Sequence, residues 1–346
     1  MKRFDVIVAG SGPAGAACAT VCARGGLSVL VLDRAKFPRD KVCGDCLNPS
    51  CWPILQRLGA AAAVRKAPHS RFRAVEIVTE NDRRFRFELP QGDFGETGIR
   101  RRDLDAILLE NTRESGAEVL HEKTVTKITP GWEVEAGGET FHAPILVAAD
   151  GRNSTVARLM KISPPAKKDR VAVQTHMPIS PENEGIVRMN LFHEGYSGAA
   201  SIGNGLWNVC LVARPGDLEQ LKARWNFPAQ QTWVAIAPLT REPCSPLHRF
   251  RHSPLLLVGD AARVVEPFTG EGIYYALRSG ELAGECLVRS TTQTYPQQHA
   301  TLYRSRLWVN QIAYHAVSHP VWASRIMEHL PGSGLLLRLL TRKVVG

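Results

Sequence analysis

Near its start the chain carries three spaced glycines between an apolar run and an alanine-rich segment. Phe4 to Ala9 carry β-branched residues without polar alternation, which predicts a buried parallel strand, and Pro13 to Arg24 predict a helix with proline in its first turn. Gly10 permits a tight turn, Gly12 lets the backbone approach an anion, and Gly15 lets the helix pack close to the strand. The segment therefore predicts a phosphate-binding turn at a helix N-terminus.

A second predicted strand, Leu27 to Leu32, ends in Asp33, which stands about 20 residues beyond the glycines. At that position in a βαβ unit an acidic side chain binds a ribose hydroxyl. A glycine turn without any ligand is the alternative. The order of strand, turn, helix, strand and acid favours a dinucleotide site.

The length and charge of the chain limit the classes of protein to which it can belong. With 346 residues it is long enough for one large α/β domain and a second, inserted or appended one. The net charge of +10 favours an anionic partner, such as a phosphorylated cofactor, an acidic substrate, a carrier protein or an anionic membrane face. We expect no nucleic-acid partner, because the arginines are scattered and no basic block is interleaved with aromatics.

Cysteine usage and hydropathy suggest the compartment. Eight cysteines without a convincing export signal are expected to be mostly reduced, and no run of about 18 apolar residues predicts a spanning helix. We therefore expect a cytoplasmic protein, or one peripheral to a membrane. Leu335 to Leu340, followed by Arg342 and Lys343, form a basic amphipathic end that would pack on the main domain or contact a membrane.

Two changes of pattern divide the rest of the chain. From about Val171 to Ala237 helical periodicity vanishes and β-type alternation takes over, with a turn at Gly203 to Gly205. This predicts a separate antiparallel layer that covers a ligand. The α/β pattern returns with a buried strand ending in Gly259 and Asp260, then a helix from about Gly270 to Arg289, and the remainder is helical.

Three segments together resemble one family. They are Gly10 to Gly15 with Asp33, then Ala149 to Ser154 (Ala-Asp-Gly-Arg-Asn-Ser), and then Val258 to Ala262 continuing to Pro267 to Ile273. They are similar to the FAD-dependent oxidoreductases with the para-hydroxybenzoate hydroxylase-like fold, and within these to the geranylgeranyl reductase-like branch. The resemblance extends from Met1 to about Ser290 and implies bound FAD.

The fold class that follows is α/β, with a Rossmann-like FAD-binding domain, an antiparallel β-sheet substrate domain and a helical C-terminus. We expect residues 1–70, 98–165 and 246–290 in the FAD-binding domain, 71–97 and 166–245 in the β-rich substrate domain, and 291–346 in the helical segment.

The resemblance and the glycine-turn argument together give a set of cofactor-binding candidates. Asp260 would accept hydrogen bonds from the ribityl hydroxyls, and backbone amides from Gly270 to Ile273 would face phosphate or the flavin pyrimidine edge. Arg101 matches the family's arginine at a helix start near FAD, with a solvated surface arginine as the alternative. The candidates are Gly10, Gly12, Pro13, Ala14, Gly15, Asp33, Arg34, Arg101, Asp150, Gly151, Gly259, Asp260, Pro267, Gly270, Gly272 and Ile273.

Cys43-Gly44-Asp45-Cys46 admits several interpretations. A zinc site is disfavoured because no second C-x-x-C or suitably spaced His pair follows, so we expect no metal. A redox dithiol and a buried bystander thiol stay open. The segment from Phe37 to Gly44 resembles that of geranylgeranyl reductases, which implies that Cys43 is the catalytic candidate, donating a proton or a polar contact in alkene reduction.

The sequence departs from the family in its β layer. Archaeal geranylgeranyl reductases have Tyr-x-Trp-x-Phe-Pro along the prenyl cavity, whereas Tyr196 to Ser201 keep only the tyrosine, and Gly198 would widen or reshape that wall. Trp207 and Trp233 are further substrate candidates. Flavin halogenation is not expected, because Trp-x-Trp-x-Ile-Pro is absent.

These observations predict an FAD-dependent oxidoreductase acting on a hydrophobic or carrier-linked small molecule, with NAD(P)H as reductant. Geranylgeranyl reductase-like reduction of a carbon-carbon double bond is the leading chemistry. Monooxygenation with NAD(P)H and oxygen is the alternative, because one scaffold supports both. A flavin electron carrier serving a protein partner is the third interpretation.

Overall fold

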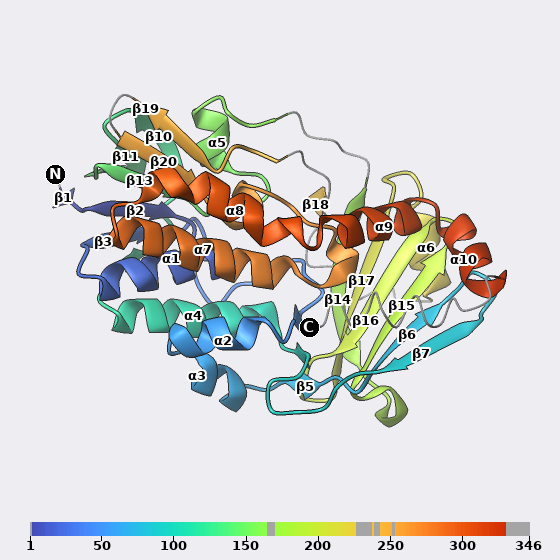
Figure 1. Cartoon of the computed structure of the whole chain (residues 1–346). Helices are drawn as coiled ribbons and strands as arrows, with labels where there is room; N and C mark the ends of the chain where they lie inside the picture. The colour runs from blue at the N-terminus through green and yellow to red at the C-terminus, as the bar shows by residue number, and fades with distance from the viewer. Residues whose placement is uncertain (1, 165–169, 226–236, 239–242, 251–252, 330–346) are drawn as a thin grey trace.

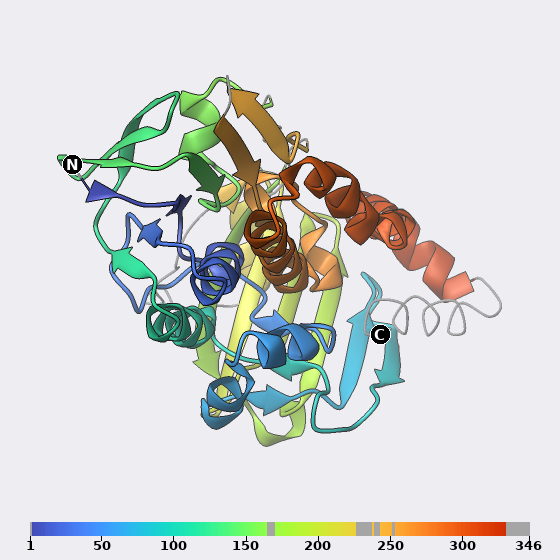
Figure 2. The same ribbon diagram turned by 60° about the vertical axis from the view of Figure 1, so that its left-hand side comes forward.

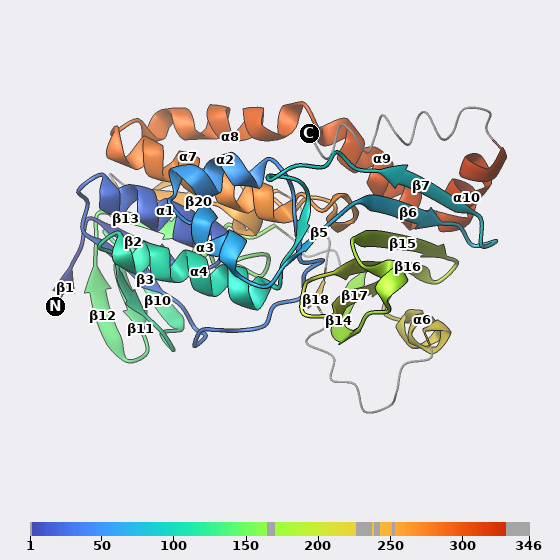
Figure 3. The same ribbon diagram turned by 90° about the horizontal axis from the view of Figure 1, so that it is seen from below.

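The computed structural model describes residues 2–164, 170–225, 237–238, 243–250 and 253–329. Two main β-sheets dominate it, with helices packed along one and at the end of the other (Figures 1, 2 and 3). The α/β fold class predicted from the sequence is confirmed.

The first sheet has six strands in the order β19-β20-β13-β2-β3-β9 and is parallel except where β19 meets β20. In chain order its strands are β2 (Val6–Ala9), β3 (Val29–Leu32), β9 (Glu118–Leu120), β13 (Ile145–Ala148), β19 (Leu247–Phe250) and β20 (Ser253–Leu257). The central strands are continuously apolar because other layers cover both of their faces. β2 starts two residues later than expected, since the Phe4 N–H donates instead to His142 of another sheet.

Three helices pack on one face of this sheet: α1 (Pro13–Arg24), α4 (Arg101–Glu114) and α7 (Gly272–Val288). The α1 and α7 backbones approach closely because α7 carries glycines at the contact. A Cβ on Gly280 would lie 2.0 Å from the Ala14 carbonyl oxygen, so no larger residue fits there. This contact holds the start of α1 beside α7.

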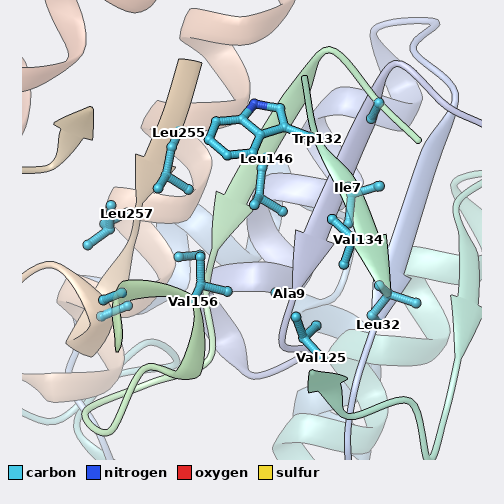
Figure 4. Close-up of a cluster of buried hydrophobic side chains, with 14 of the residues drawn as sticks. Ile7, Ala9, Leu32, Val125, Trp132, Val134, Leu146, Val156, Leu255 and Leu257 are labelled. Carbon is cyan, nitrogen blue, oxygen red and sulfur yellow. The ribbon is translucent and has the colours of Figure 1, made fainter. Parts of the chain in front are cut away.

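A smaller antiparallel sheet and α5 (Thr155–Leu159) cover the opposite face. Its strands are β10 (Val125–Thr129), β11 (Glu133–Ala136) and β12 (Glu139–His142), with β1 (Lys2–Arg3) paired in parallel to β12. Figure 4 shows Trp132 packed near Leu146 and Leu255, and its ring N–H donates to the Pro254 carbonyl at 3.1 Å.

The second main sheet has seven strands in the order β18-β14-β17-β16-β15-β6-β7 and is antiparallel except between β15 and β6. In chain order they are β6 (Ala74–Val78), β7 (Arg84–Glu88), β14 (Val171–Pro178), β15 (Ile186–Phe192), β16 (Gly195–Ser201), β17 (Leu206–Ala213) and β18 (Ala237–Pro238). The predicted turn between β16 and β17 is confirmed, since Gly203, Asn204 and Gly205 all have positive φ.

One helix interrupts the stretch that was expected to be entirely β. α6 (Leu218–Arg224) follows β17 and buries Leu218 and Leu221 against the sheet. The prediction of an unbroken β layer is therefore wrong at this point. Seven residues are too few to produce a visible helical period.

The remaining elements connect the two sheets. β4 (Cys46–Leu47), β5 (Ser70–Arg71) and β8 (Thr97–Gly98) form a three-stranded sheet, and α2 (Cys51–Arg57) and α3 (Ala61–Lys66) lie between β4 and β5 in the chain. The last described helices are α8 (Tyr295–Arg304), α9 (Leu307–Ser318) and α10 (Pro320–His329), and α9 and α10 contact the seven-stranded sheet (Figure 1). The 3-10 turns in the described residues are η1 (Pro181–Asn183), η2 (Gly259–Ala261), η3 (Pro267–Thr269) and η4 (Thr292–Thr294). No helix within the described ranges is long and apolar enough to cross a bilayer.

Candidate active site

A cavity of about 880 Å³ lies between the two sheets and below the C-terminal helices. Thirteen of the residues predicted from the sequence line it: Gly12, Pro13, Ala14, Cys43, Arg101, Gly151, Tyr196, Gly198, Asp260, Pro267, Gly270, Gly272 and Ile273. Its volume is within the range typical of small-molecule and cofactor sites. Segments far apart in the sequence therefore form one site.

The three glycines of the first turn serve different purposes. Gly10 has φ +102, and a Cβ there would lie 2.5 Å from the Ala149 oxygen, while a Cβ on Gly15 would lie 1.9 Å from the Gly10 oxygen. Chain packing alone thus requires both. A Cβ on Gly12 would meet only the Arg39 guanidinium, at 3.7 Å. The cavity beside Gly12 is therefore open, and α1 begins there without a side-chain cap.

Asp33 connects this turn to the end of β3 through hydrogen bonds. Its carboxylate accepts hydrogen bonds from the Ser11 amide and hydroxyl, both at 2.7 Å, and from the Ala35 amide at 2.8 Å. Asp33 and the exposed Arg34 do not line the cavity, and neither do Gly10, Gly15, Asp150 and Gly259. Ribose binding by Asp33 stays a prediction, since its oxygens retain acceptor capacity beyond these bonds.

The second and third segments meet across the cavity. In the second segment, Asp150 accepts a hydrogen bond from the Val156 amide at 3.0 Å. In the third, the Asp260 carboxylate lies 4.0 Å from the Arg152 guanidinium, and the Asp260 side chain is 24% exposed. Gly272 opens the 17-residue helix α7, and a Cβ at Gly272 would meet nothing within 4 Å. The N-termini of α1 and α7 thus both face open space, where a helix dipole favours an anion.

These features fit FAD. Two uncapped helix N-termini with bare glycines suit the pyrophosphate and the flavin edge, and the accessible Asp260 carboxylate suits the ribityl hydroxyls. Arg101 is not a solvated surface residue, because it is 6% exposed and forms a two-point ion pair with Asp105 at 2.9 Å.

Cys43 lies on a loop that is hydrogen-bonded to the seven-stranded sheet. Its amide donates to the Gln174 side chain at 2.9 Å, and its carbonyl accepts from Asn208 at 2.8 Å and from the Cys210 thiol at 3.0 Å. Burial raises the pKa of the Cys43 thiol, while the Arg101 guanidinium acts in the opposite direction. The thiol therefore keeps its proton at neutral pH beside a group that stabilises the thiolate.

Asp45 connects this loop to its surroundings. It is fully buried, and its carboxylate accepts from the Arg101 amide at 3.1 Å, from Gln174 at 3.1 Å and from His176 at 3.2 Å. Burial raises the pKa of Asp45, and the His176 contact opposes that rise. Sequence reasoning missed Asp45 and Gln174, although Asp45 lies inside the C-x-x-C segment.

Two other ionisable groups on the cavity wall were also missed. Glu96 is 8% exposed, its Oε2 has no hydrogen-bond partner among the described residues, and burial with the nearby Glu271 charge raises its pKa to about 7. Burial lowers the pKa of Lys41, with the Arg101 charge contributing. No sequence pattern singled out these residues, because their burial depends on the tertiary packing.

The substrate candidates separate into two groups. Tyr196 and Gly198 line the cavity, but Trp207 does not, because the β17 alternation directs it to the opposite face beside Val209 and Leu211. The expectation for Trp207 is therefore corrected. Trp233 and the basic end from Leu335 to Lys343 lie outside the described residues.

The cysteine interpretations can be compared with the geometry. None of the eight cysteines, all of which the structure describes, is part of a disulfide, and within the described part of the chain no group of three His, Cys, Asp or Glu residues could hold a metal ion. Cys46 donates its thiol hydrogen to the Gly44 carbonyl at 3.3 Å, and it also lines the cavity.

The fold and this site define an FAD-dependent oxidoreductase. Residues 3–192 match the model of the FAD binding domain family, and the chain belongs to that family. It is 30% identical to a menaquinone reductase of Mycobacterium tuberculosis over 86% of this chain and 80% of that protein. It is 29% identical to digeranylgeranylglycerophospholipid reductase 2 of Methanopyrus kandleri over 82% of this chain and 76% of that protein.

Solved structures share the fold. A geranylgeranyl bacteriochlorophyll reductase-like protein from Thermoplasma acidophilum superimposes with a TM-score of 0.70 at 21% identity, over 100% of this chain and 92% of that one. A myxobacterial chondrochloren halogenase superimposes with a TM-score of 0.77 at 20% identity, over 99% and 91%. Because one scaffold is similar to both, the fold does not choose the reaction.

Proposed function

We propose that this protein is a reductase that saturates a carbon-carbon double bond in the isoprenoid chain of a lipid-like substrate, with NAD(P)H as electron donor. The names of the two relatives above, a menaquinone reductase and a digeranylgeranylglycerophospholipid reductase, support this proposal. FAD, when bound and reduced, supplies the hydride.

The shape and chemistry of the cavity carry the proposal. One end holds the glycine turns, Asp260 and Cys43, while the other is walled by apolar side chains from the seven-stranded sheet and from α9 and α10. Those apolar residues include Ile77, Leu191, Tyr196, Ile312 and Ile326, and Phe268 of η3 packs against the same cluster. An apolar chain entering that end would exchange water for apolar contacts, which is favourable, and would bring one double bond to the polar end.

Cys43 is the group best suited to supply the proton. Its pKa is raised by burial, so the thiol is protonated at neutral pH, while the Arg101 guanidinium and the Asp45 amide stabilise the thiolate left after transfer. Proton donation by a positioned side chain contributes about 10² to 10⁴ in rate.

The absence of the large aromatic residues from this wall of the cavity does not leave empty space beside Gly198. A Cβ on Gly198 would meet the Met189 sulfur at 3.3 Å, and Met189 pairs directly with Gly198 across β15 and β16. The Met189 side chain therefore fills part of the space beside Gly198. Methionine is flexible, so this wall adapts to chains of different shape.

Anaerobic turnover tests the proposal. The enzyme with bound FAD, reduced by NADPH or NADH, would be mixed with a detergent-solubilised prenyl quinone or prenyl phospholipid, and the products analysed by mass spectrometry. A product with two added hydrogens supports reduction. No turnover without oxygen, and an added oxygen atom when air is admitted, would overturn it in favour of monooxygenation.

A variant pair links that activity to the cavity. Gly198→Trp would fill the apolar end and should abolish turnover while leaving FAD content unchanged, whereas Gly198→Ala should retain most of it because only the end of Met189 must shift. Electron delivery to a protein partner without any small-molecule product would instead favour an electron carrier.

A further inference from the structure

The exposed apolar side chains of this protein are concentrated on the last two described helices. Of the nine large apolar side chains that are exposed in the described residues, six lie between Leu307 and Ile326. Trp322 is 65% exposed, Ile326 53%, Trp308 47% and Ile312 46%. Such a grouping at one place on a surface marks an interaction site rather than ordinary scattered exposure.

This surface also borders the opening of the cavity. Ile312, Trp322 and Ile326 are exposed and line the cavity at the same time. The opposite sides of the same helices are anchored, since Val317 and Met327 pack in the cluster formed with the seven-stranded sheet. Figures 1 and 3 show α10 at the end of the molecule farthest from β1, with α9 leading to it from α8.

Acidic side chains are scarce along α8, α9 and α10. From Tyr295 to His329 the only acidic residue is Glu328, and its carboxylate is already hydrogen-bonded by Thr79 and Asn81. Arg325 lies over the Trp322 ring at 5.8 Å, and Arg83 of the neighbouring hairpin donates to the Glu328 carbonyl at 2.8 Å. An indole beside a guanidinium is the pairing expected where one side meets hydrocarbon and the other anionic headgroups.

We propose that the exposed surface of α9 and α10 docks this protein on an anionic phospholipid bilayer. Helices of 12 and 10 residues are too short to span a bilayer of about 30 Å, so they would lie in its interface. Trp308, Ile312, Trp322 and Ile326 would enter the acyl boundary, and Arg325 would contact the headgroups. A prenyl chain would then pass from the bilayer into the cavity without crossing water, a consequence that rests on the proposed function.

Vesicle flotation of the full chain with bound FAD tests this docking independently of catalysis. Binding to phosphatidylcholine vesicles containing phosphatidylglycerol should exceed binding to pure phosphatidylcholine vesicles. The double variant Trp322→Ser/Ile326→Ser should lower the partition coefficient by at least about tenfold, because two exposed apolar side chains no longer enter the lipid. Arg325→Glu should weaken binding to the anionic vesicles only.

Leu159→Ser provides the matched control. Leu159 is also an exposed apolar residue, at 36%, but it lies on α5, far from α10 in Figure 1. It should bind vesicles as the unchanged protein does, and FAD content and circular dichroism should be equal in all variants. Equal vesicle binding by the double variant and the unchanged protein would overturn the proposal.

Two further results separate this proposal from its competitors. A dimer in light scattering without vesicles, converted to a monomer by Trp322→Ser/Ile326→Ser, would assign the surface to a second copy of the chain and overturn the membrane proposal. Weaker vesicle binding by Trp308→Ser, whose exposed side chain does not line the cavity, with unchanged turnover of a detergent-solubilised prenyl lipid would support docking together with the reductase function. Vesicle binding without any reductase activity would refute the function alone.

Discussion

Arg306 donates a hydrogen bond to Glu271 at 2.6 Å, which joins the residue before α9 to the residue before α7. Glu271 is fully buried, and Asn310 of α9 also donates to its carboxylate, at 3.3 Å. Asn310 in turn accepts from the Glu266 amide at 3.0 Å, just before η3. The C-terminal helices therefore fix the loop whose amides are predicted to face the flavin.

Removing the arginine of this ion pair should destabilise the protein more than removing the charge of the glutamate. Arg306→Met leaves the Glu271 carboxylate buried with weaker compensation, which should cost about 3 to 5 kcal/mol in the free energy of unfolding. Glu271→Gln removes the buried charge and should cost less. Urea unfolding of both single variants and the double variant measures the coupling.

FAD affinity provides a second measurement on the same variants. If the pair positions the loop, Arg306→Met should raise the FAD dissociation constant even at urea concentrations where the fold is intact. Unchanged affinity, together with additive effects of the two substitutions on stability, would show that the pair does not position the FAD loop.

Two glycines of the first turn should respond differently to the same substitution. Gly12→Val fits the protein, because a Cβ there meets only the end of the Arg39 side chain, but the added methyl groups would occupy the space predicted for the pyrophosphate. We expect loss of bound FAD with near-normal circular dichroism. Gly15→Val clashes with the Gly10 carbonyl and should impair folding itself.

The flavin absorbance of purified protein and thermal unfolding followed by circular dichroism distinguish these outcomes. FAD should be released by acid precipitation from the unchanged protein, since no His or Cys lies within the turn to form a covalent link. Full FAD occupancy in Gly12→Val would contradict the predicted position of the pyrophosphate.

Local patterns explain why most of the fold was predictable from the sequence. The strand, turn and helix around Gly10 require only neighbouring residues, and the hairpin turn at Gly203 to Gly205 needs only residues that tolerate positive φ. Trp207 was wrongly expected at the substrate, because alternation predicts two faces but not which one meets the cavity.

The cluster around Cys43 shows what the sequence could not supply. Gln174 is 131 residues from Cys43 in the chain and hydrogen-bonds its amide only because β14 passes beside the loop. Asp45 is buried through its bonds to Arg101 and His176, which come from two different elements. Such contacts depend on the packing of the two sheets rather than on any local spacing.

Glu96 should make stability depend on pH. Its pKa rises from 4.5 to about 7 on folding, because burial and the Glu271 charge disfavour the carboxylate. The native state therefore binds more protons than the unfolded chain between about pH 4.5 and 7, and the free energy of unfolding falls as the pH rises through this window. The shift corresponds to a loss on the order of 3 kcal/mol above pH 7.

Glu96→Gln removes this dependence while keeping the shape of the side chain. Urea unfolding from pH 4.5 to 8 should show a flatter profile for Glu96→Gln than for the unchanged protein, with the largest gain above pH 7. Parallel profiles would mean that Glu96 titrates at its ordinary pKa in the folded protein.

Cys43 decides between the interpretations of the C-x-x-C segment. If its thiol protonates the substrate, Cys43→Ala should keep FAD binding and flavin reduction but slow substrate-dependent flavin reoxidation by about 10² to 10⁴. Cys43→Ser should be milder, because its hydroxyl can still donate. Anaerobic stopped-flow absorbance with a prenyl lipid measures this step.

Cys46→Ser is the matched control, since it also changes a thiol on the cavity wall and lies only three residues away. A proton donor requires Cys43 alone, because its thiol is the one in contact with the Arg101 guanidinium. A redox dithiol requires both sulfurs, so equal damage from the two variants would favour that pair. Normal reoxidation in Cys43→Ala would remove the thiol from the mechanism and leave the loop with a packing role, held by Gln174 and Asn208.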